Sequence, residues 1–244
     1  MEYKKITKED ILADMHTHTI FSLHGISTLK ENVTIAKTKG LKYIATTDHF
    51  VNYHNDVLNQ HQIFRARIVL ENKNTDVKVI NGFEFNIGQN VYSHRAMTET
   101  KWHPIGFHSP FLEEKCNNLD DLYHLYENLS DEFNAFVHIE RELDKFSNNK
   151  SDVYEYLKKI VLLAKSKDIY LEINELSLIR GKEELVRYWL KIAKENNNKI
   201  YLGTDSHYCD TIGNFDKTLA LINEYQYPKE LILNCNEELL ERFY

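Results

Sequence analysis

Short runs of β-forming residues alternate with longer amphipathic segments along most of the chain. The first run is Ile11–Met15, and the segment Leu29–Lys39 that follows has helical periodicity and stops at Gly40. Strands that alternate with helices of this length indicate parallel βαβ units, because parallel neighbours need a crossover connection. This alternation limits the chain to α/β folds built on a parallel sheet.

The same pattern continues to the end of the chain and gives about seven units. The predicted strands are Ile11–Met15, Tyr43–Thr47, Val77–Phe85, Pro104–Phe107, Ala135–Ile139, Tyr170–Ile173 and Lys199–Gly203. The predicted helices are Leu29–Lys39, Val57–Asn72, Leu119–Leu129, Val153–Ser166, Glu183–Glu195 and Phe215–Tyr225, and the apolar run Leu231–Asn234 closes the chain. Seven such units favour a (β/α) barrel over an open doubly wound sheet. Neither G-x-G-x-x-G nor G-x-x-x-x-G-K-[ST] is present to support the open sheet.

Composition narrows the class of protein further. Eight Gly and three Pro, with no linker-like stretch and no repeat, predict one domain over residues 1–244. A net charge of −7 argues against a protein that coats long nucleic acid. The start lacks a signal peptide and no apolar run reaches the ~20 residues of a membrane span. Three cysteines without C-x-x-C spacing predict a reduced, cytoplasmic protein.

Histidines and acids gather where the predicted strands end. In a parallel barrel these ends converge on one face, so side chains far apart in sequence would meet there. Strand residues i and i+2 point the same way, so His16 and His18 can reach one site together. The nine candidate ligands are His16, His18, His24, His49, Glu84, His108, His138, Asp205 and His207.

Such a gathering of imidazoles predicts metal ions, because clustered imidazoles cannot all stay protonated and neutral imidazole binds zinc, iron and manganese. A shared carboxylate can bridge two ions ~3.5–4 Å apart. Asp14 and Asp48 are expected to orient neighbouring histidines without binding metal. The remaining five histidines are predicted to be structural: His54, His61, His94, His103 and His124.

Three groups of motifs resemble the PHP (polymerase and histidinol phosphatase) superfamily. Asp-Met-His-Thr-His-Thr-Ile-Phe-Ser, starting at Asp14, is similar to its first motif, and Ile-Ala-Thr-Thr-Asp-His, ending at His49, to its second. Gly-Phe-Glu-Phe-Asn-Ile, Gly-Phe-His-Ser-Pro and Gly-Thr-Asp-Ser-His are most similar to the YcdX-like phosphatase branch. The resemblance implies a single-domain distorted (β/α)7 TIM-like barrel with a trinuclear metal site.

The resemblance also implies a division of the nine ligands among three divalent ions, usually zinc in this branch, with manganese or iron also suited to the ligands. His16, His18, Glu84 and Asp205 would hold one ion. Glu84 would bridge to a second, bound also by His108 and His138, and His24, His49 and His207 would hold the third. Glu84, Asp205 and His207 are therefore the expected catalytic residues.

One segment departs from the pattern of the family. After the fifth-strand histidine the family commonly continues with proline, whereas this chain reads His-Ile-Glu-Arg-Glu from His138. Arg141 and Arg180 could bind phosphate there, and a role as ordinary surface charges is at least as common. Substrate preference is therefore less predictable than metal binding.

The expected activity is hydrolysis of small phosphomonoesters, in which metal ions activate a water and neutralise the phosphoryl oxygens. Three alternatives remain open from the sequence. One is a histidinol-phosphate phosphatase, and another is a phosphodiesterase or nuclease-like hydrolase. The third is a metal-stabilised module that binds a phosphorylated ligand without catalysis. A small phosphorylated substrate is the expected partner, without long nucleic acid or membrane.

Overall fold

The computed structural model describes residues 3–22, 24–50, 76–88, 97–98, 100–109 and 116–244. Within them, seven strands form one sheet in the order of the sequence, and each pairs in parallel with the next. The strands are β1 (Ala13–Thr17), β2 (Tyr43–Phe50), β3 (Lys78–Asn86), β4 (Pro104–Gly106), β5 (Ala135–Phe136), β6 (Tyr170–Asn174) and β7 (Ile200–Gly203). The predicted distorted (β/α)7 barrel is thus confirmed.

The first and last strands close the barrel along a seam that uses few ladder bonds. At its upper end, Asp205 N–H donates to the His16 carbonyl and His18 N–H donates to the Ser206 carbonyl, both at 2.8 Å. Below them the Asp14 carboxylate accepts from the Thr204 hydroxyl at 2.6 Å and from its N–H at 3.1 Å. The seam therefore joins two strands that, with the loops that follow them, carry five of the nine candidate ligands.

A buried asparagine completes the lower end of this seam. The Asn234 amide donates to the carbonyls of Ala13 and Leu202 at 2.8 and 2.9 Å, and its oxygen accepts from Leu202 N–H at 2.7 Å. One side chain thus links the backbones of β1 and β7 and pairs three of their buried backbone groups, which need partners.

We expect Asn234→Ala to lower the free energy of unfolding by about 3 kcal/mol, because it leaves several buried backbone groups unpaired. Urea denaturation measures the change. Asn236→Ala is the matched control: its side chain only accepts from Leu239 N–H at a helix start, and such a cap is worth about 1 kcal/mol. Equal losses in the two variants would contradict a special role for Asn234.

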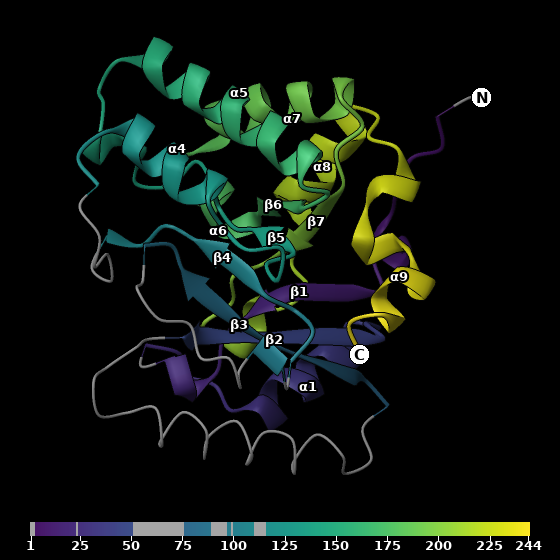
Figure 1. Cartoon of the computed structure of the whole chain (residues 1–244). Coiled ribbons are helices and arrows are strands. Elements are labelled where there is room, and N and C mark those ends of the chain that lie inside the picture. The colour runs from purple at the N-terminus through teal and green to yellow at the C-terminus, as the bar shows by residue number, and fades with distance from the viewer. Residues whose placement is uncertain (1–2, 23, 51–75, 89–96, 99, 110–115) are drawn as a thin grey trace, which may run out of the picture.

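Helices flank the strands on the outside of the barrel (Figure 1). α4, α5, α7 and α8 lie near strands β4 to β7, and α1 packs by β2. The longer helices are α1 (Leu29–Thr38), α4 (Leu119–Glu127), α5 (Lys150–Ser166), α7 (Glu183–Glu195) and α8 (Asp216–Glu224). Two short helices that the sequence analysis did not predict are α6 (Glu175–Ile179) and α9 (Glu237–Glu241).

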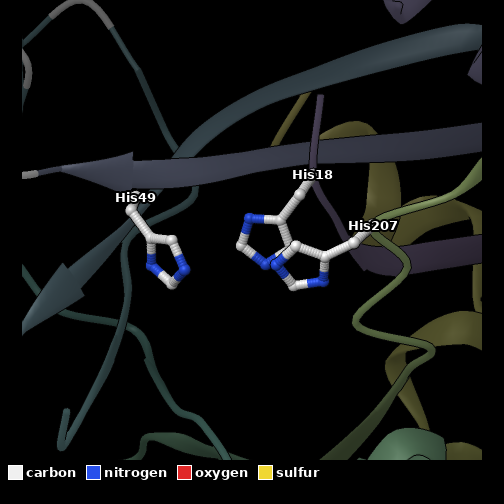
Figure 2. A group of neighbouring side chains, drawn as sticks. All are labelled: His18, His49 and His207. Atoms are coloured by element: carbon white, nitrogen blue, oxygen red, sulfur yellow. The ribbon is translucent and has the colours of Figure 1, made fainter. Parts of the chain in front are cut away.

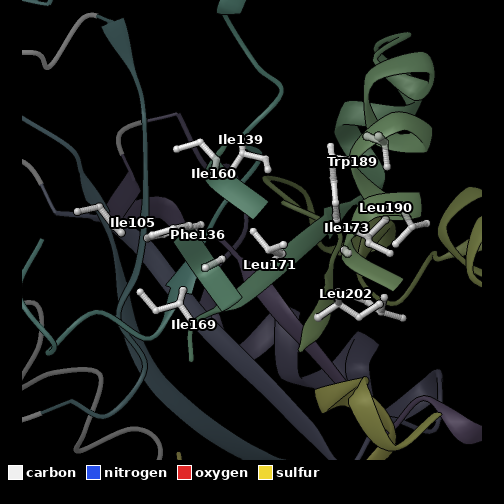
Figure 3. Close-up of a cluster of buried hydrophobic side chains, with 14 of the residues drawn as sticks. Ile105, Phe136, Ile139, Ile160, Ile169, Leu171, Ile173, Trp189, Leu190 and Leu202 are labelled. Atoms are coloured by element: carbon white, nitrogen blue, oxygen red, sulfur yellow. The ribbon is translucent and has the colours of Figure 1, made fainter. Parts of the chain in front are cut away.

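Two apolar clusters hold these layers together. The larger lies between sheet and helices, and Figure 3 shows Ile173 and Leu202 from the strands near Trp189 and Leu190 of α7. The smaller joins alternate strand residues on the opposite face of the strands, inside the barrel. Its buried members are Ala13, Met15, Tyr43, Ala45, Ile80, Trp102, Ala135, Val137, Tyr170, Tyr201, Leu233 and Leu240. This cluster closes the floor of the barrel below the candidate site.

A β-bulge in β1 lies between the residues that pack at the floor of the barrel and the residues that reach the candidate site. Asp14 pairs with Ile44 but Thr17 pairs with Thr46, so β1 has one residue more than β2 between these points. Ala13 and Met15 belong to the interior apolar cluster before the bulge. After the bulge it is His16 that points into the barrel, because the extra residue of a bulge changes which side chains face inward.

Several predicted bounds differ from the observed ones. β5 ends at Phe136 and not at Ile139, because His138 adopts a left-handed backbone with φ of 29°. The run Leu231–Asn234 forms two 3-10 turns, with one isolated bridge from Ile232 to Ile200. The predicted helix Val57–Asn72 lies outside the described residues.

No helix in the described part of the chain combines the length and apolarity needed to cross a bilayer.

Candidate metal centre

All nine candidate ligands lie in the described residues and gather at the carboxyl ends of the strands. His16, His49 and Glu84 belong to β1, β2 and β3 themselves. The other six lie in the loops that follow β1, β4, β5 and β7: His18, His24, His108, His138, Asp205 and His207. Figure 2 shows the rings of His18, His49 and His207 grouped together although they come from three different segments.

Glu84 lies at the centre of the cluster and its two oxygens face different histidines. Oε1 is 2.7 Å from His138 Nε2 and 3.2 Å from His108 Nε2. Oε2 is 3.3 Å from His16 Nε2, and it is 3.4 and 3.1 Å from the facing nitrogens of His18 and His49. A carboxylate divided in this way has the geometry needed to bridge two cations.

Asp205 supplies a second carboxylate on the His16 and His18 side. Its Oδ1 lies 3.1 Å from His18 Nε2 and 3.6 Å from His16 Nε2. Its Oδ2 faces away, 2.7 Å from Arg141 Nη1. Asp205 also has a left-handed backbone with φ of 53°, a conformation that aspartate tolerates better than most residues. The arginine thus fixes which oxygen of Asp205 is presented to the histidines.

His24 and His207 form the outer part of the cluster. Their rings stack at 4.3 Å between centroids, and His24 lies 5.0 Å from the His49 ring. His24 is exposed, whereas His207 Nε2 is buried and has no hydrogen-bond partner in the described structure. A buried imidazole nitrogen without a hydrogen-bond partner in the protein is free to bind a metal ion.

Electrostatics at the centre favour added positive charge. Burial alone would raise the pKa of Glu84, but His108, His16 and His49 lower it well below its usual value. Burial would likewise lower the pKa of His16, but the carboxylates of Glu172 and Glu84 outweigh this and raise it well above the usual range. The carboxylates thus stabilise a cation at this point.

Other histidines of the cluster are held in the neutral form that binds metal. Burial, and then the charge of Arg141, lowers the pKa of His138 to about 4. Burial, followed by the proximity of His18, lowers the pKa of His207 to about 4. Three sets of donor atoms lie within 4.8 Å of one another: His16, His18 and Glu84; His18, His49 and His207; and His49, Glu84 and His108. Neutral imidazoles and ionised carboxylates fit divalent zinc, manganese or iron.

Glu172 of β6 is a residue of the candidate site that the sequence analysis missed. Its Oε1 lies 2.7 Å from His16 Nδ1, and its Oε2 accepts from His138 N–H at 2.9 Å. It therefore orients one candidate ligand by its ring and another by its backbone. Gly203 makes room for the contact, because a β-carbon there would lie 2.2 Å from Glu172 Oε1.

The two predicted orienting aspartates act differently. Asp48 accepts from the Ser22 hydroxyl at 2.7 Å, and Ser22 Oγ lies 2.8 Å from His18 Nδ1, so Asp48 reaches the imidazole through a serine. Asp14 lies 3.4 Å from the backbone nitrogen of His16, and its other carboxylate oxygen accepts from the Thr204 hydroxyl at the seam between β1 and β7. Its pKa is raised to about 6 by burial.

Two of the five histidines predicted to be structural can be placed. His103 is buried, with Nδ1 2.8 Å from the Glu132 carbonyl and Nε2 2.8 Å from the Thr100 hydroxyl. His124 is on the surface of α4, where Nδ1 lies 3.0 Å from Glu127. The other three, His54, His61 and His94, are outside the described residues.

A family model described as the PHP domain matches residues 14–176, which include seven of the nine candidate ligands. The chain belongs to the PHP domain family. A curated PHP relative from Clostridium acetobutylicum, named as a probable phosphatase, is 30% identical and covers 95% of this chain and 93% of its own length. A probable phosphatase from Clostridium botulinum is 31% identical with the same coverage of both chains.

A solved structure shares the PHP barrel at lower identity. The histidinol phosphate phosphatase of Lactococcus lactis, in complex with zinc, L-histidinol and phosphate, has a TM-score of 0.59 and 19% identity. The match covers 88% of this chain and 94% of that one. The likeness extends over nearly the whole barrel and independently supports the fold.

Proposed function

We propose that the protein is a metal-dependent phosphatase that hydrolyses small phosphomonoesters at a site of three divalent ions. The observation that carries this proposal is the division of Glu84 between two groups of histidines at the mouth of the barrel. Membership of the PHP family and the phosphatase names of the relatives support the reaction class. Zinc in the Lactococcus structure supports zinc as the first metal to test.

In this proposal the nine side chains are grouped as their contacts suggest. His16 and His18 face both Glu84 Oε2 and Asp205 Oδ1, whereas His108 and His138 face Glu84 Oε1. The outer group is His24, His49 and His207. When bound, the ions would supply Lewis acidity, which activates water at neutral pH and offsets the charge of the phosphoryl oxygens.

The chain itself contributes positioning and a shaped cavity. Arg141 holds Asp205, with its Nε donating to the Ser177 hydroxyl at 2.8 Å and its Nη2 to the Asn174 side chain at 2.7 Å. The bonds to Ser177 of α6 and to Asn174, the residue that caps α6, anchor the arginine, so the Asp205 carboxylate keeps its orientation while substrate binds. Above the cluster opens a cavity of about 1040 Å³, far larger than a phosphate group needs. The cavity can therefore accept the whole of a small ester.

Phosphate release by the purified protein loaded with zinc or manganese tests the proposal. The substrates are 4-nitrophenyl phosphate, histidinol phosphate, sugar and nucleotide monophosphates, and bis(4-nitrophenyl) phosphate. We expect hydrolysis of monoesters that stops on chelation and returns with metal. Cleavage of the diester alone would replace the proposal by a phosphodiesterase. Metal binding without any hydrolysis would replace it by a binding module.

A further inference from the structure

The cavity above the metal ligands has a wall in which nearly every charge is already paired. Five acidic side chains line it apart from Glu84, and each has a partner that neutralises or satisfies it. The contacts are Glu142 to Lys145 at 2.9 Å, Asp144 to Lys182 at 3.6 Å, Asp205 to Arg141 at 2.7 Å, Asp216 to Lys8 at 2.7 Å, and Glu175 to the N–H groups of Lys217 and Thr218 at 3.0 and 2.8 Å. The wall therefore offers little free negative charge to a ligand.

Arg180 is the exception among the cations of this wall. It lines the cavity directly after α6, is exposed, and has no carboxylate within ion-pair distance among the described residues. The other lining cations, Arg141, Lys145 and Lys182, each contact a carboxylate. A guanidinium left unpaired inside a ligand cavity is a ready partner for a carboxylate or phosphate.

Exposed apolar side chains line the same cavity as Arg180. Ile179 is 62% exposed and Tyr208 is 47% exposed, although most large apolar residues of the chain are buried. Leu176 and Phe107 continue the apolar lining. Apolar groups with a few placed polar groups are typical of sites for small organic ligands.

We propose that Arg180 binds an anionic group on the leaving group of the substrate, whose apolar body lies against Ile179 and Tyr208. The inference rests on the proposed phosphatase function. The substrate class is a phosphomonoester of a small alcohol or phenol that carries a carboxylate or a second phosphate. A cationic leaving group, such as an amino alcohol, would meet an unpaired cation and no unpaired carboxylate on this wall.

The position of Arg180 assigns it to the leaving group and not to the reacting phosphate. Arg141, which contacts Asp205, is the cation next to the metal ligands. Arg180 is separated from Asn174, the neighbour of Asp205, by the whole of α6, which at 1.5 Å per residue puts the two backbones roughly 9 Å apart. This distance suits a group beyond the scissile bond of a small ester.

Three aryl phosphates that differ only at the para position test the inference. They carry a carboxymethyl, a carbamoylmethyl or an aminomethyl group, so the charge changes while size and reacting centre stay similar. With metal-loaded protein we expect kcat/KM to be about tenfold higher for the carboxymethyl than for the carbamoylmethyl ester, and lowest for the aminomethyl ester. Arg180→Gln should bring the carboxymethyl to carbamoylmethyl ratio near one, and Arg180→Lys should keep part of it.

Lys158→Gln is the control, because it removes an exposed cation of α5 that does not line the cavity and leaves no lining carboxylate unpaired, so the ratio should stay unchanged. A wild-type ratio near one, a preference for the aminomethyl ester, or an equal loss on both esters in Arg180→Gln would overturn the inference. These outcomes are distinct from failure of the phosphatase proposal, which would appear as no hydrolysis of the carbamoylmethyl ester by the metal-loaded wild-type protein.

Discussion

Glu84→Gln should lower kcat/KM for a phosphomonoester by about a thousandfold while the fold persists. The carboxylate faces His108 and His138 with one oxygen and His16, His18 and His49 with the other. Glutamine has one acceptor oxygen and presents its NH2 group to the other set of histidines, so it can bind a cation on only one side. Losing a shared metal ligand removes several kcal/mol of transition-state stabilisation.

Metal content, measured by mass spectrometry after gel filtration, provides a readout besides activity. Glu84→Gln should bind fewer ions per chain than the wild type, with an unchanged far-ultraviolet circular dichroism spectrum. The control is Glu142→Gln, which removes a carboxylate of the same cavity that contacts Lys145 and not a histidine. Full metal content or near-normal activity in Glu84→Gln would rule out the bridging role.

Glu172→Gln should weaken metal binding by about 10- to 100-fold, the usual effect of removing a partner that orients a metal-binding histidine. The carboxylate faces His16 Nδ1 with one oxygen and accepts from His138 N–H with the other. An amide cannot accept at both positions. If its NH2 group faces His16, the proton moves to Nε2, the nitrogen that faces Glu84 and the metal ligands. Competition with a chromophoric chelator measures the loss.

Gly203→Ala disturbs the same contact from the neighbouring strand β7 and should give a similar loss of metal affinity. The added carbon would lie 2.2 Å from Glu172 Oε1 and 2.5 Å from the His16 β-carbon, so one of the two side chains must move. Unchanged metal affinity in both Glu172→Gln and Gly203→Ala would remove Glu172 from the site.

The convergence of the nine candidate ligands could be predicted because it depends on topology more than on detail. Once the alternation of strands and helices indicates a parallel barrel, every strand must end on the same face. His49 and Glu84 then lie next to each other in the β2–β3 register, as they do here. Their assignment to particular ions remains a prediction.

Glu172 and the β1 bulge could not be predicted with the same rules. Glu172 lies within an apolar strand, Tyr-Leu-Glu-Ile-Asn, and its two-residue spacing from Tyr170 places it inside the barrel. A charged residue at an interior strand position is rare unless it is paired, and that signal could have identified it. The bulge has no such signal, because simple alternation from Met15 would direct His16 outward. The Arg141 to Asp205 contact likewise depends on how two loops meet.

The seam between β1 and β7 has a consequence for how the protein is made. His16 and His18 leave the ribosome early, but their neighbours Asp205 and His207 follow almost two hundred residues later, and Asn234 later still. Until then β1 has an unpaired edge, which makes nascent chains prone to aggregation. Contacts between such distant residues also slow folding. The complete set of candidate metal ligands can therefore form only after nearly the whole polypeptide has been synthesised, so we expect metal loading to be a late event in maturation.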